Sequence, residues 1–161
     1  MPIQRDKDIF VREMFSKIAH RYDLLNKLLS MRMDVYWRRF AVGELLISGG
    51  GSFAPITTGL FLDVATGTGD CAIEILKQGG EKKRVIGIDF TPEMIYAGRK
   101  KVEREGLSDS ITLLETNAMG LPFDDNYFDG AISAFGVRNF SDISKGIREM
   151  RRVIKENGKV V

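Results

Sequence analysis

Apolar and polar positions follow a helical period over the first third of the chain. Between residues 6 and 47, apolar side chains recur at steps of three and four, so they form one stripe along a helix. A second amphipathic piece begins at Met33, with Asp34 as its N-cap or as an acid in its first turn. We therefore predict an N-terminal helical cap. The stripe consists of Phe10, Met14, Ile18, Tyr22, Leu25 and Leu29.

From residue 60 the pattern changes to short apolar runs that alternate with helical segments. Helices are predicted over 70–78, from Pro92 to near Gly106 with the Thr91 hydroxyl as its cap, and over 141–156. Strands separated by helices indicate a parallel, Rossmann-like α/β sheet with helices on both faces, which binds ligands beyond the carboxyl ends of its strands. The predicted strands are 60–65, 84–89, 111–116 and 128–135, and a fifth that begins at 159 after Asn157-Gly158.

These patterns divide the chain into three regions. The helical cap covers residues 1–47, a glycine-rich connector covers 48–59, and an α/β domain covers 60–161. The sequence stops about three residues into the fifth strand, although a finished sheet completes that strand and covers its edge. We therefore expect the C-terminal strands of the fold to be missing after Val161.

Composition limits the partners and the compartment. A length of 161 residues suits one buried core, and a net charge of +2 is too small to indicate nucleic acid. The only cysteine, Cys71, falls inside a predicted helix and is expected to be a packed residue. The sequence has no apolar run of the ~20 residues that cross a bilayer, and its first residues lack a signal-peptide core. We expect a soluble cytoplasmic protein that binds neither nucleic acid nor a metal ion.

A glycine turn follows the first predicted strand. The run from Gly67 to Ala72 (GTGDCA) fits the pattern G-x-G-x-x-[GA], whose glycines let a nucleotide approach the backbone at a helix N-terminus. Asp89 ends the next strand, where a carboxylate can accept hydrogen bonds from ribose hydroxyls. These two features alone indicate a dinucleotide dehydrogenase.

Two acids beside the turn argue against a dinucleotide. Asp63 lies inside the first strand and Asp70 directly follows Gly69, so both carboxylates would repel a pyrophosphate. S-adenosylmethionine has an ammonium and a sulfonium group and no phosphate. The acids therefore favour this positively charged cofactor over a nicotinamide dinucleotide.

The third predicted strand ends in residues that suit an adenine. Asn117-Ala118 falls where the edge of the base would be read, although an ordinary polar turn explains Asn117 equally well. Phe90 and Met94 are apolar candidates for the face of the base. Met94 falls on the inner stripe of its helix, which favours core packing.

Polar residues also follow the fourth strand. Arg138 and Asn139 form a polar cluster at the ligand end of the sheet, but a solvated loop residue and a helix cap account for them equally well. Other residues have plainer interpretations. His20 is read as a surface residue, Arg38-Arg39 and Arg151-Arg152 as solvated helix faces, and Tyr22 and Trp37 as core aromatics.

Three blocks resemble the ubiquinone/menaquinone biosynthesis C-methyltransferase family, within the class I S-adenosylmethionine-dependent methyltransferases. YDLLNKLLSMRMDVYWR (22–38) is similar to the family's N-terminal signature, and LDVATGTGD (62–70) to its cofactor loop. FDGAISAFGVRN (128–139), with REMRRVIKENGKVV (148–161), resembles its fourth-strand signature and the element behind it. The chain departs from the family in having Ala134 where a serine is common.

The resemblance implies methyl transfer from S-adenosyl-L-methionine to a ring carbon of a polyprenylated quinol, such as demethylmenaquinol or a ubiquinone precursor. It implies a class I methyltransferase fold and a peripheral membrane contact through the lipid substrate. Whether two copies pair in a homodimer stays open. The expected cofactor contacts are Asp63, Ala65, Gly67, Thr68, Gly69, Asp89, Phe90, Asn117, Ala118 and Ala134.

The catalytic hypothesis assigns stabilisation of the developing phenolate to Arg138 and Asn139, with Tyr22 orienting the quinol. Three alternatives remain: a methyltransferase acting on another small molecule, a nicotinamide dehydrogenase, and a truncated module that binds cofactor without turnover. A lid over the prenyl tail and packing on the core are equally good interpretations of the leucine-rich segment, which contains Leu24, Leu25, Leu28, Leu29 and Met31.

Overall fold

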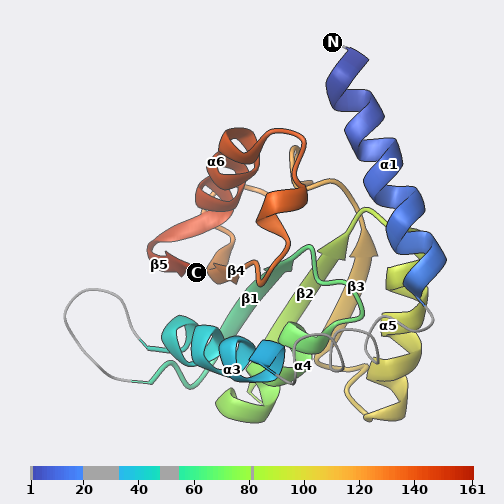
Figure 1. Cartoon of the computed structure of the whole chain (residues 1–161). Coiled ribbons are helices and arrows are strands. Elements are labelled where there is room, and N and C mark those ends of the chain that lie inside the picture. Colours follow the sequence, from blue (N-terminus) through green and yellow to red (C-terminus); the bar gives the residue numbers. More distant parts are fainter. Residues whose placement is uncertain (1, 20–32, 48–54, 81) are drawn as a thin grey trace.

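The computed structural model describes residues 2–19, 33–47, 55–80 and 82–161. Its centre is a parallel five-stranded sheet with the order β3-β2-β1-β4-β5 (Figure 1). The chain order reverses between β1 and β4, which is where sheets of this type bind ligands. The strands are β1 (Gly59–Val64), β2 (Lys83–Asp89), β3 (Ile111–Glu115), β4 (Phe128–Ile132) and β5 (Ile154–Val160).

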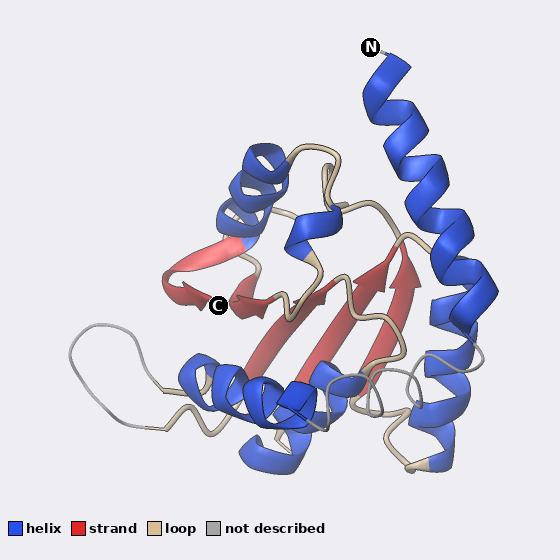
Figure 2. Ribbon diagram, in the orientation of Figure 1, coloured by secondary structure: helices blue, strands red, loops and turns tan. Residues whose placement is uncertain are grey.

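Helices cover both faces of this sheet, as the alternating pattern predicts (Figure 2). α3, α4 and α5 pack on one face and α6 on the other, while α1 runs beside α5 near the end of β3 (Figure 1). Among the described residues, no helix is long and apolar enough to cross a bilayer. The helices are α1 (Pro2–Ile18), α3 (Met33–Leu45), α4 (Asp70–Gly79), α5 (Pro92–Arg104) and α6 (Ile143–Val153), with a short 3-10 helix, η2 (Val137–Asn139).

The core consists of two layers because alternate residues of β1 point to opposite faces. Phe61 packs with residues of α3, α4 and α5, whereas Leu62 and Val64 pack with residues of α6. Each of these β1 side chains is fully buried, which stabilises the fold by roughly 1.5–3 kcal/mol per residue. Cys71 is buried in the first layer, which confirms its prediction as a packed residue. The end of β1 is therefore held firmly from both sides.

Four predicted details are wrong. The last helix ends at Val153 rather than 156, and β5 begins at once because fully buried Ile154 pairs with Phe128. A register shift then places Asn157-Gly158 inside the strand instead of before it. β4 ends at Ile132, three residues early. The Thr91 hydroxyl does not cap α5; instead, the Thr91 amide donates to Asp89.

Candidate active site

Two cavities open where the carboxyl ends of β1, β2 and β4 meet. The first, of about 250 Å³, lies between α1 and the loops after β2, β3 and β4, and is called the α1 lobe. The second, of about 410 Å³, lies between α3 and the glycine turn, and is called the α3 lobe. The two lobes form one cleft because they share five lining residues, Ala65, Gly67, Ala134, Phe135 and Arg138.

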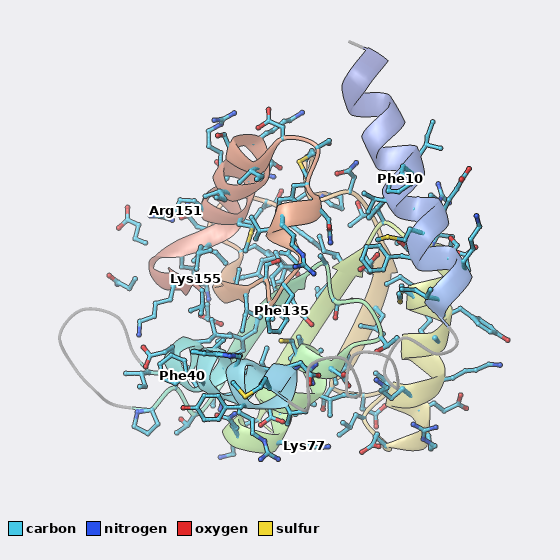
Figure 3. The ribbon with its side chains drawn as sticks, viewed as in Figure 1. Phe10, Phe40, Lys77, Phe135, Arg151 and Lys155 are labelled. Atoms are coloured by element: carbon cyan, nitrogen blue, oxygen red, sulfur yellow. The ribbon has the colours of Figure 1, made fainter. Side chains whose placement is uncertain are left out.

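The glycine turn is built from left-handed backbone. Gly67 (φ 57°) and Gly69 (φ 84°) adopt conformations that suit glycine, and Gly69 directly precedes α4. Ala65 (φ 57°) and Phe135 (φ 66°) also have positive φ, which costs on the order of 1 kcal/mol for each residue with a side chain. Both of these strained residues lie where the two lobes join. Figure 3 labels Phe135 near the centre of the molecule.

Asp63 anchors the glycine turn from below. Its side chain is 1% exposed, and its Oδ2 accepts hydrogen bonds from the Thr66 hydroxyl and from the Ala72 amide at 3.1 Å. Burial raises the pKa of Asp63 to about 7, although both hydrogen bonds act in the opposite direction. Asp63 lines the α3 lobe, but its observed hydrogen bonds tie β1 to the turn and to α4.

Asp89 connects the glycine turn to the end of β2. Its Oδ2 accepts from the Gly67 amide at 2.9 Å and its Oδ1 from the Thr91 amide at 2.9 Å. Burial raises the pKa of this carboxyl as well. An ionised carboxylate has about four acceptor positions, so these two bonds leave capacity for a ligand in the α1 lobe, which Asp89 lines.

A series of charged side chains extends from the α3 lobe, which Asp34, Arg38 and Asp70 line, to Lys101 on α5. Lys101 Nζ lies 2.9 Å from the Thr68 hydroxyl and 2.8 Å from Asp70 Oδ1. Asp70 Oδ2 lies 3.3 Å from Arg38, which in turn donates to Asp34 at 3.2 Å. Thr68 is buried, and the cluster extends from α5 through the turn to α3.

Two sequence interpretations on α3 are wrong. Arg38 was read as solvated, but its side chain is only 14% exposed, because Asp34 lies one turn earlier on the same face. Trp37 was read as a core residue, but it is 50% exposed and lines the α3 lobe. Arg152, predicted to lie on a solvated helix face, is 31% exposed and pairs there with Asp125 and Glu149. The i,i+4 acid–arginine pair was the available signal for Arg38.

The predicted adenine residues line the α1 lobe. Phe90, Asn117 and Ala118 lie together there with Asp89. The Asn117 Oδ1 accepts from the Met119 amide at 2.9 Å, so this side chain does form the local turn that was its alternative interpretation. Met94 is buried, as predicted, and also reaches the lobe.

Arg138 and Asn139 lie in η2, on the wall of the α1 lobe, and Arg138 also borders the α3 lobe. They are therefore brought close to Asp89 and Asn117 around one cavity, and Ala134 lies beside them in both lobes. The third catalytic candidate, Tyr22, lies outside the described residues, as do His20 and the leucine-rich segment.

Helix α1 contributes a wall that sequence reasoning did not assign to the site. Its residues Met14, Phe15 and Ile18 line the α1 lobe. The Ser16 hydroxyl donates to Glu93 at 2.7 Å, and Arg12 lies 3.5 Å from Glu115, so α1 is attached to α5 and β3. The apolar stripe of the first helix, Met14 and Ile18 included, was the signal, but the sequence could not show what this stripe faces.

A model of the ubiE/COQ5 methyltransferase family matches residues 3–161. The chain belongs to the ubiE/COQ5 methyltransferase family. This membership confirms the resemblance seen in the sequence blocks. The matched residues include the glycine turn, Asp89 and the residues of η2 that line the cleft.

Curated relatives carry names of the same kind. A ubiquinone/menaquinone biosynthesis C-methyltransferase UbiE from Citrifermentans bemidjiense is 49% identical over 151 residues, or 94% of this chain and 61% of the relative. A demethylmenaquinone methyltransferase from Deinococcus radiodurans is 44% identical over 158 residues, or 98% of this chain and 61% of the relative. This chain thus spans about six-tenths of the length of these relatives.

Solved structures confirm the predicted Rossmann-like class I methyltransferase fold. A chain from Methanococcus maripaludis has a TM-score of 0.74 at 24% identity, covering 90% of this chain and 61% of that one, and shows the fold alone. A SAM-dependent methyltransferase from Aquifex aeolicus has a TM-score of 0.63 at 28% identity, covering 77% and 61%. The [4+2]-cyclase SpnF has a TM-score of 0.64 at 27% identity, covering 76% and 42%, so the fold also hosts another reaction.

Proposed function

We propose that the cleft binds S-adenosyl-L-methionine and that the protein methylates a ring carbon of a polyprenylated quinol, such as demethylmenaquinol or a ubiquinone precursor. Family membership and the names of the relatives support this proposal. The geometric support is the continuity of the two lobes across Gly67, with a buried carboxylate in one lobe and a mixed-charge cluster in the other. Such a cleft suits a ligand with a nucleoside at one end and a charged amino acid at the other.

The residues of the α1 lobe fit a nucleoside. Asp89 has acceptor positions left for the ribose hydroxyls, and Phe90 offers an apolar surface for the base. Asn117 and Ala118 would meet the edge of the base through their backbone, since the Asn117 side chain already accepts from Met119. The Gly67–Gly69 backbone would border the ligand where the lobes join.

The acids beside the turn also fit this ligand better than a dinucleotide. Asp63 and Asp70 lie under and after the glycine turn, where an approaching pyrophosphate would meet their negative charge. Their observed partners lie within the protein, so we assign them to shaping the turn rather than to direct contact with the sulfonium. The support for S-adenosylmethionine over a dinucleotide therefore comes from the negative charge of these acids and not from a direct bond between them and the ligand.

When bound, S-adenosylmethionine supplies an electrophilic methyl group. The task left to the chain is to orient the quinol in line with that group and to stabilise the developing phenolate. Arg138 carries a permanent positive charge on the wall shared by both lobes, and Asn139 adds an amide donor beside it. We assign these two residues to the phenolate oxygen, and Tyr22 to orientation of the ring.

A turnover assay tests the proposal. Purified protein is incubated with S-adenosylmethionine and reduced demethylmenaquinol, and the quinone product is examined by mass spectrometry for one added methyl group. Arg138→Ala is expected to lower turnover by about 10²–10³-fold while the affinity for S-adenosylhomocysteine stays unchanged. Full turnover in this variant would remove Arg138 from the mechanism, and transfer to unprenylated phenols but not to the quinol would favour another small-molecule acceptor.

The proposed substrate also implies contact with a membrane surface. A polyprenyl tail resides in a bilayer, so the proposal includes a peripheral membrane contact by a cytoplasmic protein. Trp37, the only tryptophan, is half exposed at the edge of the α3 lobe, and its fluorescence should shift to the blue when quinol-loaded vesicles are added. Unchanged emission would argue against this contact at α3. Homodimer formation is a separate proposal that sedimentation analysis would decide.

A further inference from the structure

We propose that Arg152, together with Glu149, is a positioning residue that fixes the segment Asn117–Ala118 and thereby makes the cleft selective for adenine. The role rests on the proposed function, which places the edge of the base at this segment. Arg152 and Glu149 line neither lobe. Both lie on α6, which packs on the face of the sheet opposite α3, α4 and α5 (Figure 1). They therefore act on the ligand only through the loop that they hold.

Arg152 uses every hydrogen-bond donor of its side chain. A guanidinium has five N–H groups. In Arg152, two of them donate to the Glu149 carboxylate, at 2.9 and 2.8 Å. The other three donate to the loop between β3 and β4: to the carbonyl oxygens of Leu121 and Phe123 at 3.0 and 2.8 Å, and to Asp125 Oδ1 at 2.8 Å. Because all its donors are matched, this side chain holds the loop in one orientation.

Glu149 completes a clamp on Leu121. Its Oε2 accepts from the Leu121 amide at 2.8 Å, so both backbone groups of this residue are bound by side chains of α6. The hydrogen bonds from Arg152 lower the pKa of Glu149 to about 2, so the pair stays charged at neutral pH. Hydrogen bonds between charged groups, and from charged groups to the backbone, are stronger than neutral ones. Arg152 and Glu149 are called the α6 clamp.

A short turn connects the clamped Leu121 to the segment that meets the base. The Gly120 amide donates to the Asn117 carbonyl at 3.2 Å, and the Met119 amide donates to Asn117 Oδ1 at 2.9 Å. Leu121 and Ala118 are also buried in the same core layer as residues of α6. The clamp on Leu121 therefore fixes the peptide groups of Asn117 and Ala118 as well.

A fixed backbone segment distinguishes purines by the direction of its hydrogen bonds. The edge of adenine presents an amino donor beside an acceptor nitrogen, whereas the edge of hypoxanthine presents an acceptor oxygen beside an N–H donor. Backbone groups that match one base leave the other unpaired. A segment free to rotate its peptide groups adapts to either base. The α6 clamp favours adenine because it prevents this adaptation.

Two ligands that differ only at the edge of the base test the role of the clamp. S-adenosylhomocysteine carries adenine, and S-inosylhomocysteine carries hypoxanthine on the same ribose and amino acid. Calorimetric dissociation constants of both are measured with the unaltered protein, with Arg152→Met, and with the matched control Arg148→Met, which replaces an exposed arginine one turn earlier on α6.

The ratio of the two dissociation constants is the readout, because a loss of stability alone weakens both ligands equally. The unaltered protein should bind S-adenosylhomocysteine about 10–100-fold more tightly than S-inosylhomocysteine. Arg152→Met should lower this preference by about 3–10-fold, and Arg148→Met should leave it unchanged.

Glu149→Gln covers the case in which Arg152→Met does not fold. Glutamine keeps the size of the side chain and an acceptor for the Leu121 amide but loses the charge, so the preference should fall in the same direction and by less. An unchanged preference in Arg152→Met, or in Glu149→Gln where Arg152→Met does not fold, would overturn the proposal.

Failure of the proposed function looks different. An unaltered protein that binds neither ligand would remove the adenosyl ligand and the role of the clamp together. Equal affinity of the unaltered protein for both ligands would overturn the role of the clamp alone, because S-adenosylhomocysteine would still bind.

Discussion

Asp63 is the residue before the last in β1, and Asp89 ends the neighbouring strand β2; both lie almost entirely away from solvent. Burial raises the pKa of both carboxyl groups, and backbone amides of the glycine turn and of the helix starts compensate in part. The turn that borders the proposed ligand is therefore held by two carboxylates whose charged forms the interior disfavours. Single buried acids of this kind make the shape of the turn sensitive to pH.

Asp63 should make the stability of the protein depend on pH. Burial raises its pKa to about 7 in the folded protein, from an ordinary value of 3.8. The folded state thus holds the proton more tightly than the unfolded state, so the free energy of unfolding should fall as pH rises from about 4 to about 7 and level off above. Asp63→Asn keeps an oxygen acceptor and cannot ionise, so it should be more stable by roughly 2–4 kcal/mol at pH 8.

Urea unfolding of the unaltered protein and of Asp63→Asn, at about pH 4.5, 6 and 8, measures how the free energy of unfolding of each depends on pH. Asp109→Asn is the control, because Asp109 is exposed and its replacement should leave the pH slope in place. An Asp63→Asn variant that retains the full slope would show that another group is responsible.

The places of single residues could be predicted from the sequence where they depend on a local pattern, such as a turn or the end of a strand. The glycines of the turn, Asp89 at the end of β2 and buried Cys71 lie where they were expected. The environments of Arg38 and Trp37 were predicted wrongly because both depend on what packs against α3. The pairing of Arg38 with Asp70 joins segments 32 residues apart, and no local pattern encodes such a contact.

At the scale of elements, the site depends on how closely α5 approaches the glycine turn. A Cβ added at Gly98 would lie 2.7 Å from Leu113 Cδ1 and 3.2 Å from the Thr68 carbonyl carbon and oxygen. Lys101, one turn later on the same helix, holds the Thr68 hydroxyl and Asp70. The helix therefore sets the position of the turn through backbone contact as well as through a charged side chain.

Gly98→Ala is expected to displace the turn. The leucine can rotate, but the Thr68 backbone must shift, so the overpacking should cost about 1–3 kcal/mol of stability and should weaken binding of S-adenosylhomocysteine. Thermal unfolding and calorimetry measure the two effects. Gly120→Ala is the matched control, because a Cβ there meets open space. A gain in stability at position 98 with unchanged binding, as plain helix propensity would give, contradicts this account.

The order and type of the elements after residue 60 could be predicted because apolar runs and caps are local signals. The boundary between α6 and β5 could not, since it depends on the pairing of Ile154 with Phe128 across the sheet. The contribution of α1 to the site was likewise hidden. Its apolar residues were predicted to form one stripe, yet Phe10 is exposed while Met14 and Ile18 border the α1 lobe.

At the scale of the whole molecule, the sheet brings together residues that lie far apart in the sequence. The reversal of strand order between β1 and β4 opens the cleft, and α1 and α3 add walls on two sides of it. The fold alone does not decide the reaction, since a cyclase shares it. The distinction comes from the charges around the cleft together with membership of the ubiE/COQ5 methyltransferase family.

The central claim is that this cleft holds an adenosyl amino acid rather than a dinucleotide. Calorimetric titration of the purified protein with S-adenosylhomocysteine and, separately, with NAD compares the two directly. The account predicts saturable binding of one S-adenosylhomocysteine per chain and no measurable heat from NAD at the same concentrations. Binding of NAD without binding of S-adenosylhomocysteine would contradict it.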